Sequence, residues 1–126
     1  MKIDVEIIQC ACKALKYASI VTDNNTFPKE FKGYTSAFGV AVVQMGLYPA
    51  LLIYEDENAR TNADRHKLSK ALHELLKILH KDMYNDNTNL STQYANKNES
   101  QRKEMQTHVD TALVALKLAL RIYKPE

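Results

Sequence analysis

The most constraining feature of this sequence is residues 34–54, which carry no charge and hold eleven Ala, Val, Leu, Ile and Phe side chains. A membrane-spanning helix needs about 20 predominantly apolar residues. However, Gly46 and Pro49 interrupt the middle, and no cluster of Lys or Arg flanks either end. Gly costs about 1 kcal/mol and Pro about 3 kcal/mol inside a helix, but Pro is tolerated in a first turn. We therefore expect two short, buried helices, 34–45 and 47–57, that meet at Gly46.

Length and composition favour a single helical domain over residues 1–126. A chain of this length buries about two-thirds of its unfolded surface and needs no disulfide or metal to fold. Apolar residues recur at helical spacing in residues 3–21, 63–83 and 99–123, and residues 84–89 read as a loop. We therefore predict an all-α, compact bundle of five or six helices, with a short central helical hairpin and a long C-terminal helix.

Charge and cysteine content narrow the class of protein only slightly. The formal charge is +2, and the basic surplus lies in the second half of the chain. Cys10 and Cys12 point about 200° apart on a helix, so they cannot easily form a disulfide with each other. Free cysteines, together with no signal peptide and no anchor motif, predict a reducing cytoplasm and no membrane attachment.

Three histidines, His66, His73 and His80, recur every seven residues and attract attention as possible metal ligands. Seven residues of helix rise about 10.5 Å, so these side chains cannot share a metal. Zinc sites on helices use i, i+3 or i+4 pairs instead. We predict a solvated polar face in preference to a phosphate contact, with no metal site and no cofactor.

Evidence for an enzyme is sparse. No phosphate-binding loop, dinucleotide fingerprint or nucleophile elbow is present, so we expect no catalytic activity. One alternative is a helical ribonuclease of the HEPN type, in which Arg102 and His108 would act on a phosphodiester. Another alternative is a helical protein–protein interaction module.

Basic residues form stripes on the first and last predicted helices, at Lys13 and Lys16 and at Lys117, Arg121 and Lys124. If these helices pack side by side, the stripes could form one groove for a nucleic-acid backbone. The competing interpretation is that scattered surface charges keep a helical bundle soluble.

The last predicted helix has a second apolar face, which includes Val114, Leu118 and Ile122. A helix with two apolar faces is either deep in the core or touches another molecule. We predict a contact with another subunit at these three residues.

Two segments carry a resemblance to a known family. Residues 44–54 read QMGLYPALLIY and follow a helix that starts at Tyr34, and residues 111–121 read TALVALKLALR. In order and spacing these elements resemble the small α-helical subunit of type III-B CRISPR effector complexes, the Cmr small subunit. The chain departs from the family at Leu118, where a tryptophan is usual, and at residues 55–57, which are acidic where the family tends to have Lys.

The resemblance implies a non-catalytic subunit in antiviral defence. Such subunits stack head to tail and line the channel that holds the guide–target RNA duplex. The implied partners are guide RNA, target RNA, other CRISPR effector subunits and further copies of this chain. Under this hypothesis the RNA backbone is contacted by Lys13, Lys16, Lys117 and Arg121.

Overall fold

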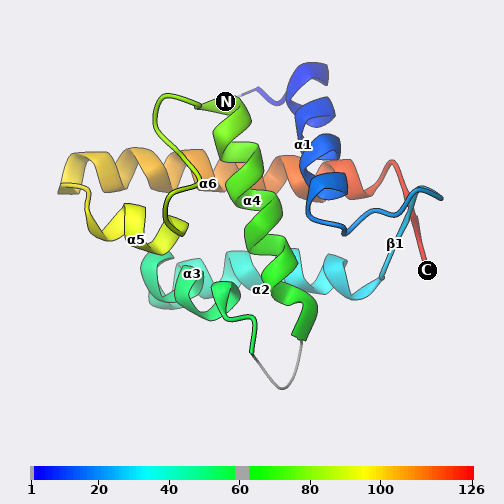
Figure 1. The fold of residues 1–126 in the computed structure, drawn as a ribbon, viewed down its shortest axis with the longest axis horizontal. Coiled ribbons are helices and arrows are strands. Elements are labelled where there is room, and N and C mark those ends of the chain that lie inside the picture. The colour runs from blue at the N-terminus through cyan, green and yellow to red at the C-terminus, as the bar shows by residue number, and fades with distance from the viewer. Residues whose placement is uncertain (1, 59–62) are drawn as a thin grey trace.

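The chain folds into helices that pack around one core, as the computed structural model shows for residues 2–58 and 63–126 (Figure 1). A short 3-10 helix, Ala63–Arg65, precedes the fourth α-helix. The α-helices in this part of the chain are α1 (Val5–Tyr17), α2 (Glu30–Met45), α3 (Leu47–Glu55), α4 (His66–Leu79), α5 (Leu90–Ala95) and α6 (Glu99–Leu120). The predicted all-α class, with six helices and a long last helix, is confirmed.

The longest helix, α6, packs chiefly against α1, α2 and α4. In Figure 1, α1 and α4 both run across α6, and α1 and α4 also contact each other. The hairpin of α2 and α3 packs against the same core, with α2 contacting α6 and α3 contacting α4 and α5. Among the described residues, no helix is long and apolar enough to cross a membrane.

The predicted break at Gly46 is confirmed. Gly46 adopts φ 95°, a left-handed conformation that favours glycine, and it separates α2 from α3. Pro49 lies in the first turn of α3, where its missing N–H had no helical partner. The start of α2 differs from the prediction, because the helix already begins at Glu30.

The expectation that both hairpin helices are buried on most of their circumference is wrong. Phe38, Val42 and Leu51 do lie in the core. The outer sides, however, expose large apolar side chains, of which Val43 is 87% and Val40 is 54% exposed. Met45, Tyr48, Leu52 and Ile53 are also exposed. Residues 34–54 therefore pack into the core on one side only, and their other side is exposed.

The acidic residues that end α3 have structural partners. The Glu55 carboxylate accepts the backbone N–H of Ser91 at 3.0 Å and also the Ser91 hydroxyl. Ser91 lies in the first turn of α5, so Glu55 satisfies an N–H group that has no partner within that helix. Asp56 accepts the backbone N–H of Asn58, and Glu57 pairs with Lys70 at 3.7 Å.

Two short strands tie the last residues of the chain to the connector between α1 and α2. The strand β1 (Thr26–Phe27) pairs in parallel with β2 (Lys124–Pro125). The Glu126 N–H donates to the Phe27 carbonyl at 2.8 Å, and the Thr26 hydroxyl donates to the Glu126 carboxylate at 3.0 Å. This pairing fixes the turn that follows α6 against the body of the domain.

Candidate nucleic-acid interface

A groove between α2 and the end of α6 brings together three cationic side chains, Lys32, Lys117 and Arg121, of which the sequence analysis predicted only the last two. It has a volume of about 310 Å³. Its lining residues are Lys32, Thr35 and Ser36 from α2, and Lys117, Leu120 and Arg121 from α6 and the turn after it. We call this the α2–α6 groove.

The three cations of the α2–α6 groove have no ionic partner among the described residues. The ion pairs in that part of the chain involve other lysines, namely Lys70, Lys77 and Lys103. Within the groove, the Thr35 side chain is buried and donates to the Lys32 carbonyl at 2.9 Å. Ser36 is exposed and can reach a ligand. A cluster of unpaired cations with a hydroxyl beside it is suited to phosphate oxygens.

The α2–α6 groove continues into an apolar depression of about 360 Å³. The two share Ser36 and Lys117. The depression is further lined by Gly39, Val40, Val43 and Gln44. The surface between α2 and α6 therefore changes from basic to apolar along its length.

The residues predicted to bind RNA fall into two separate groups. Lys117 and Arg121 lie in the α2–α6 groove, whereas Lys13 and Lys16 are exposed on α1. The Lys16 ammonium lies 5.8 Å from the centre of the Tyr123 ring, a cation–π contact. The helices α1 and α6 do pack together, but the groove beside Lys117 and Arg121 is formed with α2 in place of α1.

Lys32 lines the groove but was not among the residues predicted from the sequence to bind RNA. It stands four residues before Ser36, so both lie on one face of α2. That spacing is the only signal in the sequence, and it does not say that this face lies beside Lys117. The neighbourhood exists because α2 packs against α6.

The predicted subunit-contact residues are exposed. Val114 is 44%, Leu118 is 37% and Ile122 is 62% exposed. Val114 and Leu118 project from the outer side of α6, and Ile122 follows the end of the helix. Ala115, which the sequence places on the same apolar face, is buried in the core. The second apolar face is therefore partly core and partly surface.

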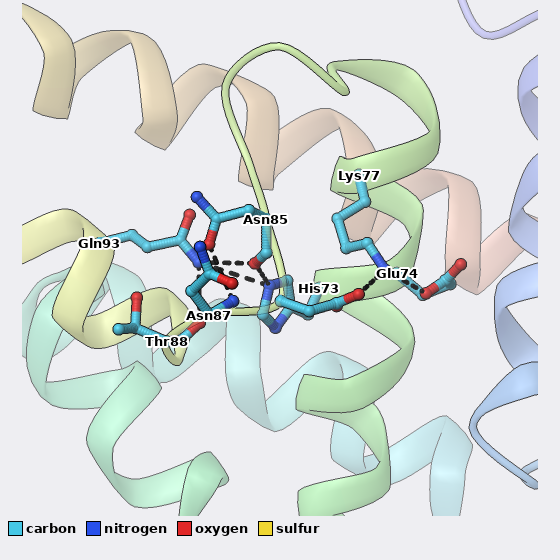
Figure 2. Close-up of polar contacts among 8 residues, drawn as sticks. His73, Glu74, Lys77, Asn85, Asn87, Thr88 and Gln93 are labelled. Carbon is cyan, nitrogen blue, oxygen red and sulfur yellow. Dashed lines mark hydrogen bonds and ion pairs between the residues drawn. The ribbon is translucent and has the colours of Figure 1, made fainter.

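The polar face of α4 is solvated only in part. Lys70 and Lys81 are exposed, whereas His73 and Lys77 are half-buried and contact the loop that follows the helix. Figure 2 shows His73 and Gln93 turned toward the loop that follows α4. The His73 Nε2 atom lies 2.7 Å from the Asn85 carbonyl, and the Gln93 amide donates to the carbonyls of Asn85 and Thr88 at 3.0 and 2.8 Å.

Lys77 extends the same set of contacts at the next turn of α4. Its ammonium lies 2.7 Å from Asp86 and 3.2 Å from Glu74. The hydrogen bond to Asp86 raises the pKa of Lys77, and the same bond lowers the pKa of Asp86. The polar face of α4 therefore fastens a loop.

Arg102 and His108, the residues of the ribonuclease alternative, serve different neighbours. Arg102 donates from Nε to the Tyr94 carbonyl at 3.1 Å and from Nη2 to the Ala95 carbonyl at 2.8 Å, which satisfies the end of α5. The His108 ring lies on another side of α6, with Nδ1 2.9 Å from the Tyr84 hydroxyl. The two side chains do not converge on one site.

In the described part of the chain, no three His, Cys, Asp or Glu side chains could hold a metal ion.

Comparison with known proteins gives a family but no individual relative. The family model described as CRISPR-associated protein (Cas_Cmr5) matches residues 8–122, which is most of the chain. No curated protein and no solved structure matches the chain significantly.

Proposed function

The chain belongs to the Cas_Cmr5 family, the small subunits of type III-B CRISPR complexes, and from this premise we propose that it binds RNA through the α2–α6 groove. The observation that supports the proposal is the convergence of three cations without ionic partners among the described residues, Lys32, Lys117 and Arg121. Such cations bind a phosphate backbone without reading its sequence, and their binding weakens as salt rises. Sequence specificity would come from pairing between guide and target RNA.

We propose that the subunit is non-catalytic. General acid–base catalysis on a phosphodiester needs a group such as His or a carboxylate within hydrogen-bond reach. The side chains that line the α2–α6 groove are cations, hydroxyls and one leucine. Arg102 and His108, the candidate catalytic pair of the ribonuclease alternative, form hydrogen bonds with separate partners. These observations favour binding over cleavage.

Membership of the family makes other CRISPR effector subunits the partners of this chain. Within that assembly we propose that copies stack on one another through the exposed apolar side chains Val114, Leu118 and Ile122. Burial of apolar surface drives such contacts at about 25 cal/mol per Å². The α2–α6 groove would then be repeated along the stack and follow the RNA.

The RNA proposal is tested by fluorescence anisotropy with a labelled single-stranded RNA. We expect the double substitution Lys117→Glu/Arg121→Glu to weaken binding by roughly 100-fold at low salt, because two phosphate contacts become repulsive. The matched control is Lys13→Glu/Lys16→Glu, which makes the same change in net charge on α1. Equal losses in both variants would show non-specific attraction and would contradict the α2–α6 groove as the site.

The assembly proposal is tested by expression with the neighbouring effector genes. We expect the wild-type chain to co-purify with the complex and its guide RNA. The substitution Leu118→Glu should reduce the number of copies per complex while leaving RNA binding by the isolated chain unchanged. A protein that stays outside the complex, with no RNA-dependent association, would refute the proposal.

A further inference from the structure

A cluster of aromatic and titratable side chains closes the end of α4 against α6. The rings of His80 and His108 stack with their centroids 3.7 Å apart and their planes inclined by 13°. Tyr84, which is 3% exposed, places its hydroxyl 2.9 Å from Nδ1 of His108. Its ring also meets both imidazoles edge-on, at 6.2 Å from His80 and 6.0 Å from His108.

The charged groups that act on the two imidazoles are few. Burial lowers the pKa of His80, and Glu104 opposes that shift. Burial also lowers the pKa of His108, with a further lowering by His80, while Glu104 raises it and Lys97 lowers it. Lys97 places its ammonium 5.7 Å from the Tyr84 ring centre. The helix α1, which packs on both α4 and α6, adds none of the described charges that act on the pair.

The stack of the two rings favours neutral imidazoles. Two imidazolium rings stacked at 3.7 Å would repel each other, because like charges this close in a half-buried place are poorly screened. Burial and Glu104 raise the pKa of Tyr84, so its hydroxyl keeps its proton and can donate to Nδ1 of a neutral His108. Protonation of His108 makes Nδ1 a donor, and the Tyr84 hydroxyl can then accept. The charged form is therefore opposed by repulsion within the ring stack and not by loss of this hydrogen bond.

We propose that His80, Tyr84 and His108 form a proton-sensitive clasp, closed at neutral pH, that releases the loop after α4 when the two imidazoles take up protons. The clasp goes beyond the proposed function and shares no residue with the α2–α6 groove. Its loop borders an open depression of about 420 Å³. That depression is lined chiefly by amide side chains, including Asn85, Asn87, Gln93, Asn96 and Gln101. Opening of the clasp would change this surface.

The loop can be followed by amide hydrogen exchange of the wild-type protein at pH 7.5, 6.5 and 5.5, corrected for intrinsic rates. We expect the protection of residues 80–89 to fall below about pH 6.5, by up to roughly tenfold per pH unit for each proton taken up on opening. Residues 112–120 of α6 should keep their protection. A constant ratio between the two segments over this range would overturn the proposal.

The double substitution His80→Gln/His108→Gln removes the two stacked imidazoles and keeps His73, which contacts Asn85 of the same loop. It should abolish the pH response of the loop. The control His66→Gln removes a histidine at the other end of α4 and should leave the response intact. If the double variant responds as the wild type does, the proposal is wrong. RNA binding at pH 7.5 should be the same in all three proteins, so this test is separate from that of the α2–α6 groove.

Wild-type histidine resonances give a measurement that does not depend on folding of a variant. We expect the ring signals of His80 and His108 in the wild-type protein to titrate with midpoints below 6.5. A midpoint at or above 6.5 for both rings would refute the clasp.

Discussion

Two polar surfaces of this molecule look alike in sequence and behave differently in the fold. The face of α4 carries His73 and Lys77, and both are engaged with the loop that follows the helix (Figure 2). The α2–α6 groove carries Lys32, Lys117 and Arg121, none of which forms an ion pair among the described residues.

The difference separates polar groups that stabilise the fold from polar groups that can bind something else. A polar group satisfied within the chain contributes about 1 kcal/mol to stability and has little left to offer a ligand. Cations without an internal partner contribute almost nothing to stability, and each of them can neutralise a phosphate of a nucleic-acid backbone. We therefore expect substitutions on the α4 side to change stability and those in the groove to change binding.

The largest effect is expected for Tyr84→Ala on the α4 side. The Tyr84 ring is buried between His80, His108 and Lys97, so its removal leaves a cavity and costs about 3–5 kcal/mol of the free energy of unfolding. Lys117→Ala in the groove should change that free energy by less than about 0.5 kcal/mol. Urea denaturation at pH 7.5 measures both. A loss below about 1 kcal/mol for Tyr84→Ala would show that the cluster does not hold the loop.

The sequence predicts elements better than it predicts neighbours. The break at Gly46 was predictable because Gly and Pro act locally, and the last helix begins at Glu99, where the prediction placed it. Lys32 and Lys117 line the same groove, and His80 stacks on His108, although both pairs of residues are far apart in the chain. Such pairs depend on how α2 and α4 pack on α6, which no local pattern encodes. For the same reason the groove was expected between α1 and α6.

The burial of the hairpin shows a related limit. An uncharged segment such as residues 34–54 is consistent with burial on all sides, but a domain of this size has too little interior to cover two helices completely. Val40 and Val43 therefore remain exposed beside the groove. Composition alone could not say which side faces outward.

A smaller effect is expected for Gln93→Ala, which removes one link between α5 and the loop. The Gln93 amide donates to the carbonyls of Asn85 and Thr88, so its loss should cost about 1–2 kcal/mol and speed amide exchange in residues 85–89. The matched control is Gln44→Ala, at the apolar end of the groove, which should leave both quantities unchanged. Equal effects of the two substitutions would remove the distinction between the two surfaces.

A still smaller change separates the lysines of the two surfaces through salt dependence. For single-stranded RNA, each phosphate contact contributes about 0.7 to the slope of log K against log salt concentration. We expect Lys32→Ala to lower the slope by about that amount and to weaken binding a few-fold. Lys77→Ala should not change the slope, because the Lys77 ammonium is engaged by Glu74 and Asp86. If Lys77→Ala lowered the slope and Lys32→Ala left it unchanged, the RNA contact would lie on the α4 surface and not in the α2–α6 groove.

The smallest expected effect concerns pH and the ion pair between Lys77 and Asp86. The hydrogen bond from Lys77 lowers the pKa of Asp86 below its ordinary 3.8. Because the folded-state pKa is the lower one, the pair stabilises the fold above about pH 4, and this contribution is lost as the pH falls through the folded-state value. Asp86→Asn should therefore lose less stability than the wild type between pH 5 and pH 3 in urea denaturation. Asp23→Asn is the control, since the Asp23 carboxylate makes no hydrogen bond or ion pair among the described residues, and it should lose as much as the wild type. If Asp86→Asn follows the wild type instead, the contact is a surface pair without energetic weight, and other contacts, including those of His73, Gln93 and Tyr84, hold the loop.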